Sequence, residues 1–490
     1  MHTVLVANRG EIAVRVIRAC REAGLRTVAV YSEADAGALH PRLADAAVPL
    51  GPADPRESYL NSARLIDAAR ESGADAVHPG YGFLAESAEF AAAVQEAGLV
   101  FIGPPPDVIA RLGDKRAARR LAAACGVPAV PGFDESDASD ERLLEAAGRL
   151  GFPLIIKAAE GGGGRGMRLV ETPDGMPQAI AAARREAQAA FGTGTLLLER
   201  YLPEIRHIEV QVLADGRGTI LALGERECSL QRRYQKILEE APSPFVTPAL
   251  REQLTAAAVR VAQAAGYVNA GTVEFLVDSE GRWYFLEVNT RLQVEHPVTE
   301  AVTGVDLVKA QIRIAAGEPL SLGAVGISGH AIECRVLAED PAQGFSPTPG
   351  PVWMLDEPAG PGIRVDSGLR AGWRVPAAYD PLLSKVIVWD RTRREAIDRM
   401  AEALRRYVIL GCRTNLVFLQ EIISHAAFRR GDTAVGFLDR YFAGWHPATP
   451  DLALAAAAAA EVIGGSPGAG RGPADPWETV GPWRLGAGRA

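Results

Sequence analysis

The chain has 490 residues, of which 48% are hydrophobic and 23% charged, and its formal net charge is −8. This length predicts about three domains, with cores that need neither disulfides nor metals to hold them together. The acidic balance excludes a broad cationic surface for nucleic acid, so any anionic ligand must meet local basic residues. We therefore expect an ordinary globular protein without a nucleic-acid partner.

The N-terminus and the cysteines both indicate a cytoplasmic protein. Residues 3–10 are typical of a strand and a turn and not of a signal peptide. The longest apolar run, residues 452–460, is too short to cross a bilayer, so we expect no membrane association. The five cysteines form no CxxC pair, which argues against zinc or a disulfide framework and favours a reducing compartment.

Residues 1–113 predict a doubly wound α/β domain, because short apolar runs alternate with amphipathic ones. The expected parallel strands are residues 4–7, 27–31, 75–78 and 99–102, and the expected helices are residues 11–23, 56–70 and 84–97. We place Arg15 on the polar face of the first helix, opposite its apolar stripe. The loop at residues 78–83 follows a strand where open sheets place ligands, although a tight turn explains it equally well.

Four further segments follow this first domain. Residues 114–131 predict a linker that contains a helix, and residues 132–201 a small α/β unit. Residues 202–446 mix helices with alternating strands, whereas residues 447–490 are Ala-rich and then Gly/Pro-rich, which is typical of a flexible tail.

A run of four glycines, residues 161–164, lies between two predicted strands and is flanked by Lys157 and Arg165. Bare backbone N–H groups of such a loop can close over phosphate oxygens. A flexible glycine linker is the alternative, but it does not explain why the preceding buried strand ends in a lysine. We therefore expect a phosphate-binding lid.

Two acidic residues are predicted to meet across a β-hairpin. With its turn at residues 280–281, the hairpin places Asp278 opposite Trp283 and Glu274 opposite Glu287. Asn289 then points to the same side, two residues further along. Two carboxylates at such a short distance repel each other. A divalent cation such as Mg²⁺ or Mn²⁺ between them turns that cost into a gain. The alternative is a solvated strand edge with two independent glutamates.

Directly after this hairpin, Arg291, Gln293 and Glu295 alternate and share one face while the chain stays extended. A cation, an amide and a base beside a metal–phosphate site suit a small anion that must lose a proton. We expect His296 to be a packing residue. The basic run at residues 231–236 is, taken alone, equally consistent with a solvated surface.

Taken together, these motifs resemble biotin carboxylase, the ATP-grasp component of biotin-dependent carboxylases. The motifs that carry the resemblance are residues 8–13, 78–83, 113–115, 161–166, 231–233, 287–291 and 293–299, and they follow one another in order from residue 1 to about 446. The resemblance implies a doubly wound N-terminal domain and then an ATP-grasp fold with a mobile lid at residues 132–201. It implies that ATP and bicarbonate form carboxyphosphate, which then carboxylates biotin on a carrier protein.

The same resemblance assigns roles to individual residues. The ATP-binding residues would be Lys115, Lys157, Gly162, Gly163, Gly164, Gly166, Glu199, Arg200, Leu202, His207, Gln231, Glu274 and Glu287. Glu274, Glu287 and Asn289 would surround the metal. Lys236, Arg291, Gln293, the Val294 backbone N–H and Glu295 would hold bicarbonate, with Glu295 as the base. Arg335 would stabilise the biotin enolate oxygen, and Tyr81 and Gly82 would line the biotin pocket.

The expected partners are a biotin carrier, a second copy of the chain in a homodimer, and a carboxyltransferase subunit. Residues 475–477 and 481–485 resemble the segment that follows the carboxylase domain in acyl-CoA carboxylase α subunits, which usually continue into a biotinyl domain. No biotinyl Met-Lys-Met motif occurs here, so we expect the carrier on a separate chain or lost from a longer ancestor. Tyr234 stands where relatives often have a polar residue, and its role stays open.

Two other functions remain open from the residues alone. Another ATP-grasp ligase that activates a carboxylate as an acyl phosphate would use the glycine loop and Glu274 equally well. A catalytically silent subunit that only binds nucleotide would be expected to lack a metal carboxylate or Glu295, and this chain has all of them.

Overall fold

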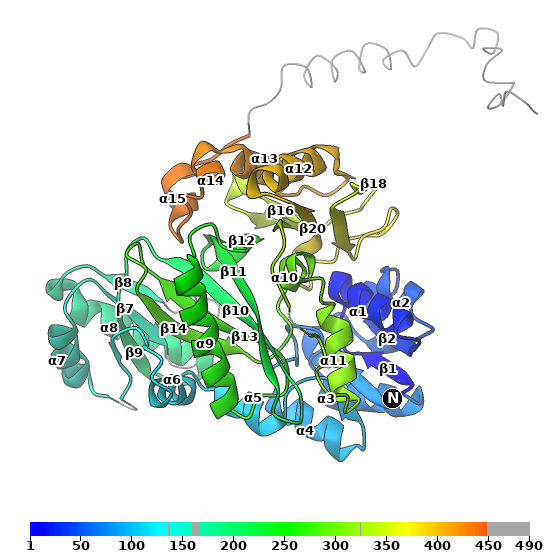
Figure 1. The fold of residues 1–490 in the computed structure, drawn as a ribbon, viewed down its shortest axis with the longest axis horizontal. Coiled ribbons are helices and arrows are strands. Elements are labelled where there is room, and N and C mark those ends of the chain that lie inside the picture. The colour runs from blue at the N-terminus through cyan, green and yellow to red at the C-terminus, as the bar shows by residue number, and fades with distance from the viewer. Residues whose placement is uncertain (136–137, 159–166, 324, 448–490) are drawn as a thin grey trace, which may run out of the picture. The chain divides into compact units, whose positions relative to one another are not determined.

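The N-terminal part of the chain forms a five-stranded, all-parallel sheet with the order β3-β2-β1-β4-β5 (Figure 1). This is a computed structural model, and it describes residues 1–135, 138–158, 167–323 and 325–447. The strands are β1 (Thr3–Val6), β2 (Arg26–Ser32), β3 (Ala46–Gly51), β4 (Ala76–His78) and β5 (Val100–Phe101). Four of them match the predicted strands to within one residue at each end. The edge strand β3 was not predicted, because its apolar run is short and interrupted by Pro49.

Five helices follow or connect these strands. They are α1 (Gly10–Glu22), α2 (His40–Leu43), α3 (Ser62–Glu71), α4 (Ala88–Glu96) and α5 (Pro106–Gly113). The prediction of one helix over residues 56–70 is wrong at its start. The Asn61 side chain accepts a hydrogen bond from the Arg64 N–H and so caps α3, while residues 55–57 form a separate 3-10 turn.

Arg15 is buried, contrary to its predicted place on the polar face of α1. Its Nη2 lies 2.9 Å from Oε1 of Glu300 and 2.7 Å from Oδ1 of Asp306. These acids lie almost 300 residues further along the chain, so no periodicity within α1 could reveal them. A buried guanidinium needs such partners, because an unpaired charge in the interior is very costly.

A second sheet has eight antiparallel strands in the order β14-β13-β10-β11-β12-β15-β20-β19. The strands are β10 (Arg206–Ala214), β11 (Ile220–Arg232), β12 (Gln235–Ala241), β13 (Asn269–Val277), β14 (Trp283–Asn289), β15 (His330–Leu337), β19 (Ile363–Ser367) and β20 (Leu382–Asp390). Helix α9 (Pro248–Ala264) lies across the strands β10, β11 and β13 (Figure 1).

The strands under α9 have one apolar and one polar face. On β10, Ile208 and Val210 belong to the core cluster that α9 completes, whereas His207 and Glu209 alternate with them. Because successive side chains of a strand point to opposite faces, the polar residues gather on the side away from α9. The core thereby fixes which way the polar residues point.

A third sheet has four strands in the order β6-β9-β7-β8. It comprises β6 (Gly132–Phe133), β7 (Leu154–Ala158), β8 (Arg168–Val170) and β9 (Leu196–Arg200), with α7 (Asp140–Leu150) and α8 (Met176–Phe191). Strands β7 and β8 pair antiparallel and flank the glycine loop. Residues 159–166, which include that predicted lid loop, lie outside the described residues, as does the predicted tail from residue 448.

The remaining elements complete the unit Met1–Trp445. They are α6 (Lys115–Ala124), α10 (His296–Thr303), α11 (Leu307–Ala315), α12 (Arg393–Arg406), α13 (Leu416–Ser424), α14 (Ala426–Arg430), α15 (Phe437–Tyr441), β16 (Glu339–Asp340), β17 (Ser346–Pro347), β18 (Met354–Asp356) and β21 (Val408–Leu410). Helices α12 and α13 pack with β15 and β20 in a core of their own.

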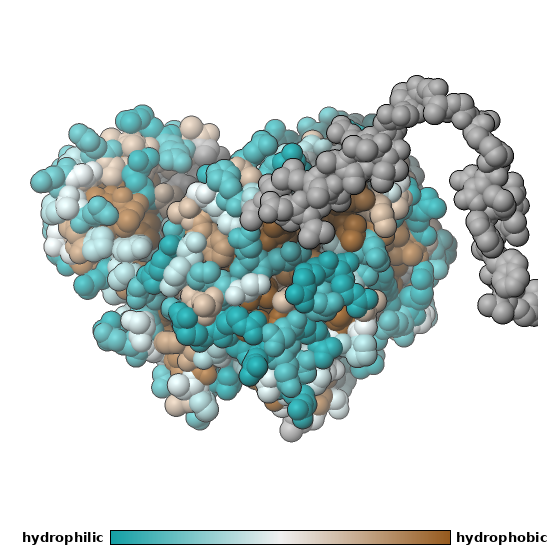
Figure 2. All heavy atoms as spheres, turned by 90° about the horizontal axis from the view of Figure 1, so that it is seen from above, coloured by the Kyte–Doolittle hydropathy of each residue, from teal (hydrophilic) through white to brown (hydrophobic). Residues whose placement is uncertain are grey.

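Hydrophilic side chains dominate the face drawn in Figure 2, where apolar ones gather in separate patches. The most exposed large apolar residues include Trp353, directly before the short strand β18, and Met354, the first residue of that strand. Among the described residues, none of the helices combines the length and the hydrophobicity needed to span a bilayer.

Burial of His78 at the end of β4 makes stability depend on pH. Burial lowers the pKa of His78 from 6.5 to about 4, whereas the unfolded chain takes up the proton near the ordinary value. Stability should therefore fall as the pH drops from about 6.5 to 4, by roughly 3 kcal/mol for this residue. His78→Asn keeps an acceptor for the Gly80 N–H, which lies 3.0 Å from Nδ1, but removes the titrating group.

We expect His78→Asn to lose less stability than the wild type between pH 7.5 and 5 in guanidinium unfolding followed by circular dichroism. His2→Asn, at the exposed N-terminus, is the matched control and should follow the wild-type pH dependence. Identical pH dependence in all three proteins would show that the buried imidazole does not contribute.

Candidate functional site

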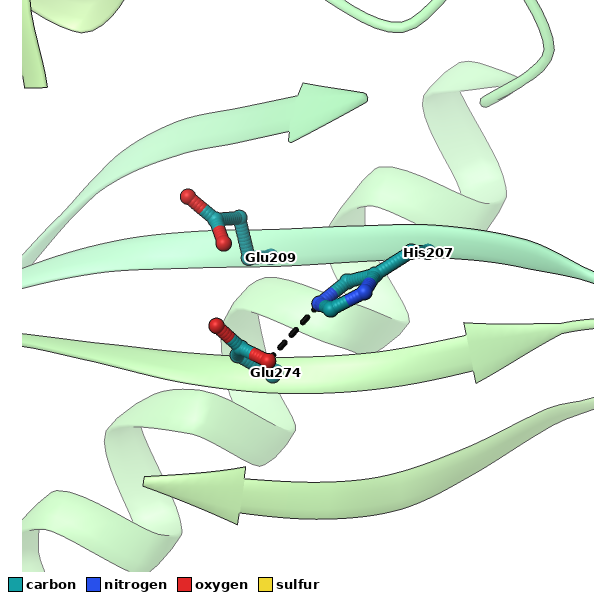
Figure 3. Close-up of side chains that lie close together, drawn as sticks. All are labelled: His207, Glu209 and Glu274. Carbon is teal, nitrogen blue, oxygen red and sulfur yellow. Dashed lines mark ion pairs between the residues drawn. The ribbon is translucent and has the colours of Figure 1, made fainter. Parts of the chain in front are cut away.

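The polar face of the eight-stranded sheet gathers buried ionisable side chains. His207 and Glu209 from β10 point to the same side as Glu274 from β13 (Figure 3). The His207 Nε2 atom lies 2.7 Å from Oε2 of Glu274, and ligand atoms of all three residues lie within 4.8 Å of one another. Strand pairing explains this arrangement, because Glu209 lies directly opposite Glu274 in the register.

Lys236, from the start of β12, lies at the centre of this acidic group. Its Nζ is 2.6 Å from Oε2 of Glu209, 2.9 Å from Oε1 of Glu274 and 2.7 Å from Oε1 of Glu295. Burial alone would lower the pKa of Lys236, but the three carboxylates hold it well above its usual value. The basic run at residues 231–236 is therefore not simply a solvated surface.

Glu295 comes directly before α10 and is fully buried. Besides Lys236, it accepts a hydrogen bond from Nη2 of Arg335 at 2.9 Å. Burial raises the pKa of Glu295, but the charges of Lys236, Arg335 and Arg226 outweigh that effect and hold it well below its usual value. The carboxylate is thus ionised and held between two cationic donors.

Arg335 lies on β15 between two acids. Its Nε donates to Oε1 of Glu239 at 2.6 Å, in addition to the contact with Glu295. Burial raises the pKa of Glu239 to about 7 despite the neighbouring guanidinium. Arg335 therefore shares its charge between a carboxylate that titrates near neutral pH and one that stays ionised.

A buried arginine below the site orients Glu209. The Nε atom of Arg226, on β11, lies 2.5 Å from Oε1 of Glu209, and the Arg226 side chain is fully buried. Its other nitrogens donate to Gln211, Thr272 and Thr299, so every nitrogen of the guanidinium has a partner. With one Glu209 oxygen on Arg226 and the other on Lys236, this carboxylate is fixed in place.

The predicted pair of acids on the hairpin is present, with Glu274 opposite Glu287. The predicted register nearer the turn is wrong, because Val277 and not Asp278 lies opposite Trp283. A bulge absorbs this difference of one residue and leaves Leu286 without a partner in the register. Next to the bulge, the Phe285 N–H donates to the Pro128 carbonyl at 2.7 Å, a tertiary contact outside the hairpin.

Asn289 and the two residues that follow the hairpin join the same network. Asn289 Nδ2 donates to Oε1 of Glu274 at 2.8 Å, and Gln293 Nε2 donates to the same oxygen at 3.0 Å. Arg291 donates to Gln293 and Asn289, and its Nε lies 3.0 Å from Oε2 of Glu86. The segment turns instead of staying extended, yet hydrogen bonds still bring the three predicted residues Arg291, Gln293 and Glu295 to one site.

The predicted metal ligands fit a hard divalent cation. Burial and the neighbouring Glu274 raise the pKa of Glu287, and Lys115 offsets this only in part from 3.7 Å. A cation between the two carboxylates would remove this repulsion, and an all-oxygen donor set suits Mg²⁺. A bound cation would have to displace existing contacts, because Asn289 Oδ1 accepts from Arg291 and Glu274 Oε1 accepts from Lys236, Asn289 and Gln293.

Lys157 and Glu199 form an ion-pair cluster on the four-stranded sheet, together with Arg119. Burial raises the pKa of Glu199, but Lys157, Arg119 and more weakly Lys115 lower it below its usual value. Lys115 therefore lies between this cluster and Glu287. Of the other predicted nucleotide residues, Arg200 is exposed at the end of β9 and Leu202 is partly buried just after it, whereas Gly162, Gly163, Gly164 and Gly166 lie outside the described residues.

Gln231, near the end of β11, and Tyr234, in the turn that follows, both belong to the hairpin of β11 and β12. Gln231 Nε2 lies 2.8 Å from Nδ1 of His207, so these two predicted nucleotide contacts are linked. Tyr234, whose role the sequence left open, lies in the turn with φ +65° and is half-exposed.

The predicted biotin-pocket loop follows β4, at the edge where the order of the parallel sheet reverses between β1 and β4. Asn8, which follows β1, donates through Nδ2 to the carbonyls of Pro79 and Tyr81 at 2.7 and 2.8 Å. Gly80 has φ +63°, and a Cβ there would lie 2.9 Å from Nδ2 of Asn8. Asn8 therefore holds the backbone that carries Tyr81 and Gly82.

Four residues of this network were not predicted from the sequence as part of the site: Glu209, Arg226, Glu239 and Glu86. An acid between apolar neighbours on a strand, as at Glu209, is a usable signal because buried charges need partners. The other three give no comparable signal, since their contacts come from separate segments of the chain.

Three family models match successive parts of the chain. Residues 1–109 match "Biotin carboxylase, N-terminal domain", residues 114–322 match "Carbamoyl-phosphate synthase L chain, ATP binding domain", and residues 333–440 match "Biotin carboxylase C-terminal domain".

Similar proteins include a biotin carboxylase from Nostoc sp., 49% identical over 437 residues that cover 89% of this chain and 98% of its own length. Biotin carboxylase 1 of Bacillus subtilis is 48% identical over 89% of this chain and 98% of its own length. The alpha subunit of methylcrotonoyl-CoA carboxylase from Oryza sativa is 50% identical over 89% of this chain, but the match spans only 60% of that longer protein.

Two solved structures are similar over about nine tenths of the chain. A biotin carboxylase–β-γ-ATP complex from Campylobacter jejuni has a TM-score of 0.87 and 42% identity, and the match covers 90% of this chain and 98% of that one. The biotin carboxylase domain dimer of 2-oxoglutarate carboxylase from Hydrogenobacter thermophilus, in complex with MgADP, ADP and bicarbonate, has a TM-score of 0.87 and 45% identity, with 91% and 99% covered.

Loss of the central ammonium should destabilise the protein in a pH-dependent way. Lys236→Met leaves three carboxylates facing one another without their shared cation, and breaking a buried pair typically costs about 3–5 kcal/mol. Their pKa values would rise, so the deficit relative to the wild type should shrink as the pH falls from 8 to 5. Denaturant unfolding at both pH values measures this effect.

Lys309→Met is the control, because Lys309 forms ion pairs with Glu22 and Asp306 on a different face of the molecule. We expect this variant to differ from the wild type by less than about 1 kcal/mol at either pH. A Lys236→Met protein with wild-type stability at pH 8 would contradict the proposed electrostatic role.

Proposed function

The chain belongs to the biotin carboxylase family, and from that premise we propose how its residues divide the reaction among themselves. It is an ATP-grasp ligase that carboxylates biotin with ATP and bicarbonate, the first half-reaction of biotin-dependent carboxylases. One observation supports these roles above all: Glu295 lies ionised between Lys236 and Arg335.

Bicarbonate binds where Glu295 lies between its two cations. Lys236, Arg291, Gln293 and the Val294 backbone N–H hold the anion in this proposal. An incoming anion competes with Glu295 for the donors of Lys236, which releases the carboxylate from the charge that depresses its pKa. Glu295 thereby becomes a stronger base at the moment at which bicarbonate must lose its proton. The resulting carbonate oxygen attacks the γ-phosphate to form carboxyphosphate, with ADP as the leaving group.

Arg335 acts in the second step, the carboxylation of biotin. Carboxyphosphate breaks down to CO₂ and phosphate, the phosphate takes up the N1 proton of biotin, and N1 attacks CO₂ to give carboxybiotin. Loss of that proton places negative charge on the ureido oxygen, and a guanidinium at that point stabilises the developing oxyanion. Tyr81 and Gly82 line the biotin pocket on the opposite side. Because Arg335 also contacts Glu295, bicarbonate and biotin react within reach of one shared group.

Nucleotide binding involves the four-stranded sheet and the hairpin of β13 and β14. Lys115, Lys157 and the glycine loop that includes Gly162, Gly163, Gly164 and Gly166 hold the phosphates, while Glu199, Arg200 and Leu202 form the adenine side. His207 and Gln231 place the nucleotide between these two groups. Glu274, Glu287 and Asn289 would hold Mg²⁺, with Mn²⁺ as an alternative ion, and the cation would neutralise phosphate charge.

The expected partners follow from the reaction. Biotin is presented by a carrier on another chain, and a carboxyltransferase subunit uses the carboxybiotin. A homodimer is the proposed assembly, supported by the dimer of the Hydrogenobacter thermophilus domain. A cytoplasmic location is supported by the five cysteines, all of which are described and unpaired. The predicted segments 1–113, 114–131, 132–201, 202–446 and 447–490 are proposed as the working division of the chain.

The base assignment predicts a selective loss of chemistry. In an assay with free biotin, ATP turnover by the wild type should require bicarbonate and increase with biotin. Glu295→Gln keeps the size of the side chain but cannot accept the proton, and its single amide oxygen can accept from only one of the two cations, so carboxylation should fall by roughly 100-fold or more. Calorimetric affinity for ATP should stay within about twofold. Carboxylation at the wild-type rate would remove Glu295 from the role of base.

The hairpin assignment predicts a selective loss of Mg²⁺–ATP affinity. Glu287→Gln removes one of the two opposed carboxylates, and we expect about a tenfold weaker calorimetric affinity for Mg²⁺–ATP at low free Mg²⁺, recovered in part at high Mg²⁺. Glu280→Gln, an exposed glutamate in the turn of the same hairpin, is the matched control and should bind as the wild type does. Equal affinities for both variants would contradict the metal site.

A further inference from the structure

Lys385, on β20, is a buried cation that the roles above leave unused. Its side chain is completely inaccessible to solvent. The register places it between Arg335 on the neighbouring strand β15 and the buried acid Asp366 on the other neighbour, β19. Like charges directly opposite each other on a sheet are destabilising, and a buried lysine loses its hydration as well. Acids on the neighbouring segments, Asp366 and Glu11, must therefore offset the charge of this lysine.

Three contacts of the Lys385 ammonium converge on the loops that carry the reaction. Nζ donates to the Val294 carbonyl at 2.8 Å. It lies 3.2 Å from Oε2 of Glu11 in the first turn of α1. It also lies 5.5 Å from the centre of the Tyr81 ring, within the range of a cation–π interaction. Lys385 thus joins the bicarbonate loop and the biotin-pocket loop.

Glu11 is the counter-charge that keeps this ammonium in place. It is buried, and its carboxylate oxygens make no hydrogen bond among the described residues, so the ion pair with Lys385 is its main polar interaction. Burial raises the pKa of Glu11 to about 7, which shows how costly the position is for a carboxylate. Glu11 and Lys385 come from elements of two different sheet domains, so their ion pair connects the N-terminal domain to the site.

We propose that Lys385 is a positioning residue: by holding the Val294 carbonyl it fixes the backbone on which the Val294 N–H and Glu295 meet bicarbonate, and it supports the Tyr81 ring from below. This inference rests on the proposed function, since it concerns the same bicarbonate loop. It assigns no proton transfer or substrate contact to Lys385. The ammonium acts only through the groups that it holds.

The test compares substrate dependence in Lys385→Met and the wild type. Loss of a charged donor leaves the Val294 carbonyl unpaired and the loop less restrained, so we expect the KM for bicarbonate to rise roughly 10- to 100-fold. The Kd for ATP, measured by calorimetry, should stay within about twofold. A merely structural role would instead lower the active fraction and leave the KM for bicarbonate unchanged, and that result would overturn the proposal.

Arg393→Met is the matched control. Arg393 also pairs with a buried acid, Glu240, at 2.7 Å, but from α12 and away from the bicarbonate loop. Its KM for bicarbonate should equal that of the wild type. If Lys385→Met does not fold, the double variant Lys385→Met/Glu11→Leu replaces the pair by apolar groups, a change that buried ion pairs often tolerate. It should show the same rise in the KM for bicarbonate.

Hydrogen exchange separates this inference from the proposed function. Backbone amides of residues 292–296 should exchange at least tenfold faster in Lys385→Met than in Arg393→Met, whether or not the protein uses bicarbonate. Equal exchange in the two variants would overturn the positioning role. Absence of bicarbonate-dependent ATP turnover in the wild type would contradict the proposed function, while the exchange comparison would still decide the role of Lys385.

Discussion

The ammonium of Lys236, buried among three glutamates, is the interaction on which the site depends. Without it, Glu209, Glu274 and Glu295 would face one another in a region from which water is largely excluded. Each of these acids also has a second partner of its own. Glu209 pairs with Arg226, Glu274 with His207 and Glu295 with Arg335. One cation therefore holds together three carboxylates whose other partners differ.

The two-sided character of the central sheet makes this concentration of charge possible. Side chains at alternate positions of β10 and β13 pack against α9 in a continuous apolar core, so the opposite face can hold charged groups without loss of the fold. The parallel N-terminal sheet contributes the loops after β1 and β4, which the Asn8 side chain joins. The charged network and the loops that Asn8 joins thus belong to sheets with core clusters of their own.

Local patterns predicted the parts of the site that lie within one hairpin or one loop. The pairing of Glu274 with Glu287 could be predicted because alternation along two strands determines which side chains face each other. The same reasoning placed Asp278 instead of Val277 opposite Trp283, because alternation does not reveal a bulge, and at this bulge Phe285 bonds to Pro128, more than 150 residues away. The buried position of Arg15 could not be predicted for the same reason, because Glu300 and Asp306 are remote in sequence.

The class of fold, the family resemblance and the chemical types of the site residues could all be predicted from the sequence, because periodicity and short motifs are local properties of the chain. Which charges neutralise one another became visible only in the folded protein. Whether a glutamate is a base, a metal ligand or a structural anchor depends on the cations that surround it, and at this site those cations come from β11, β12 and β15. Electrostatic pairing is a property of three-dimensional proximity, and proximity between distant segments is set by how the cores pack.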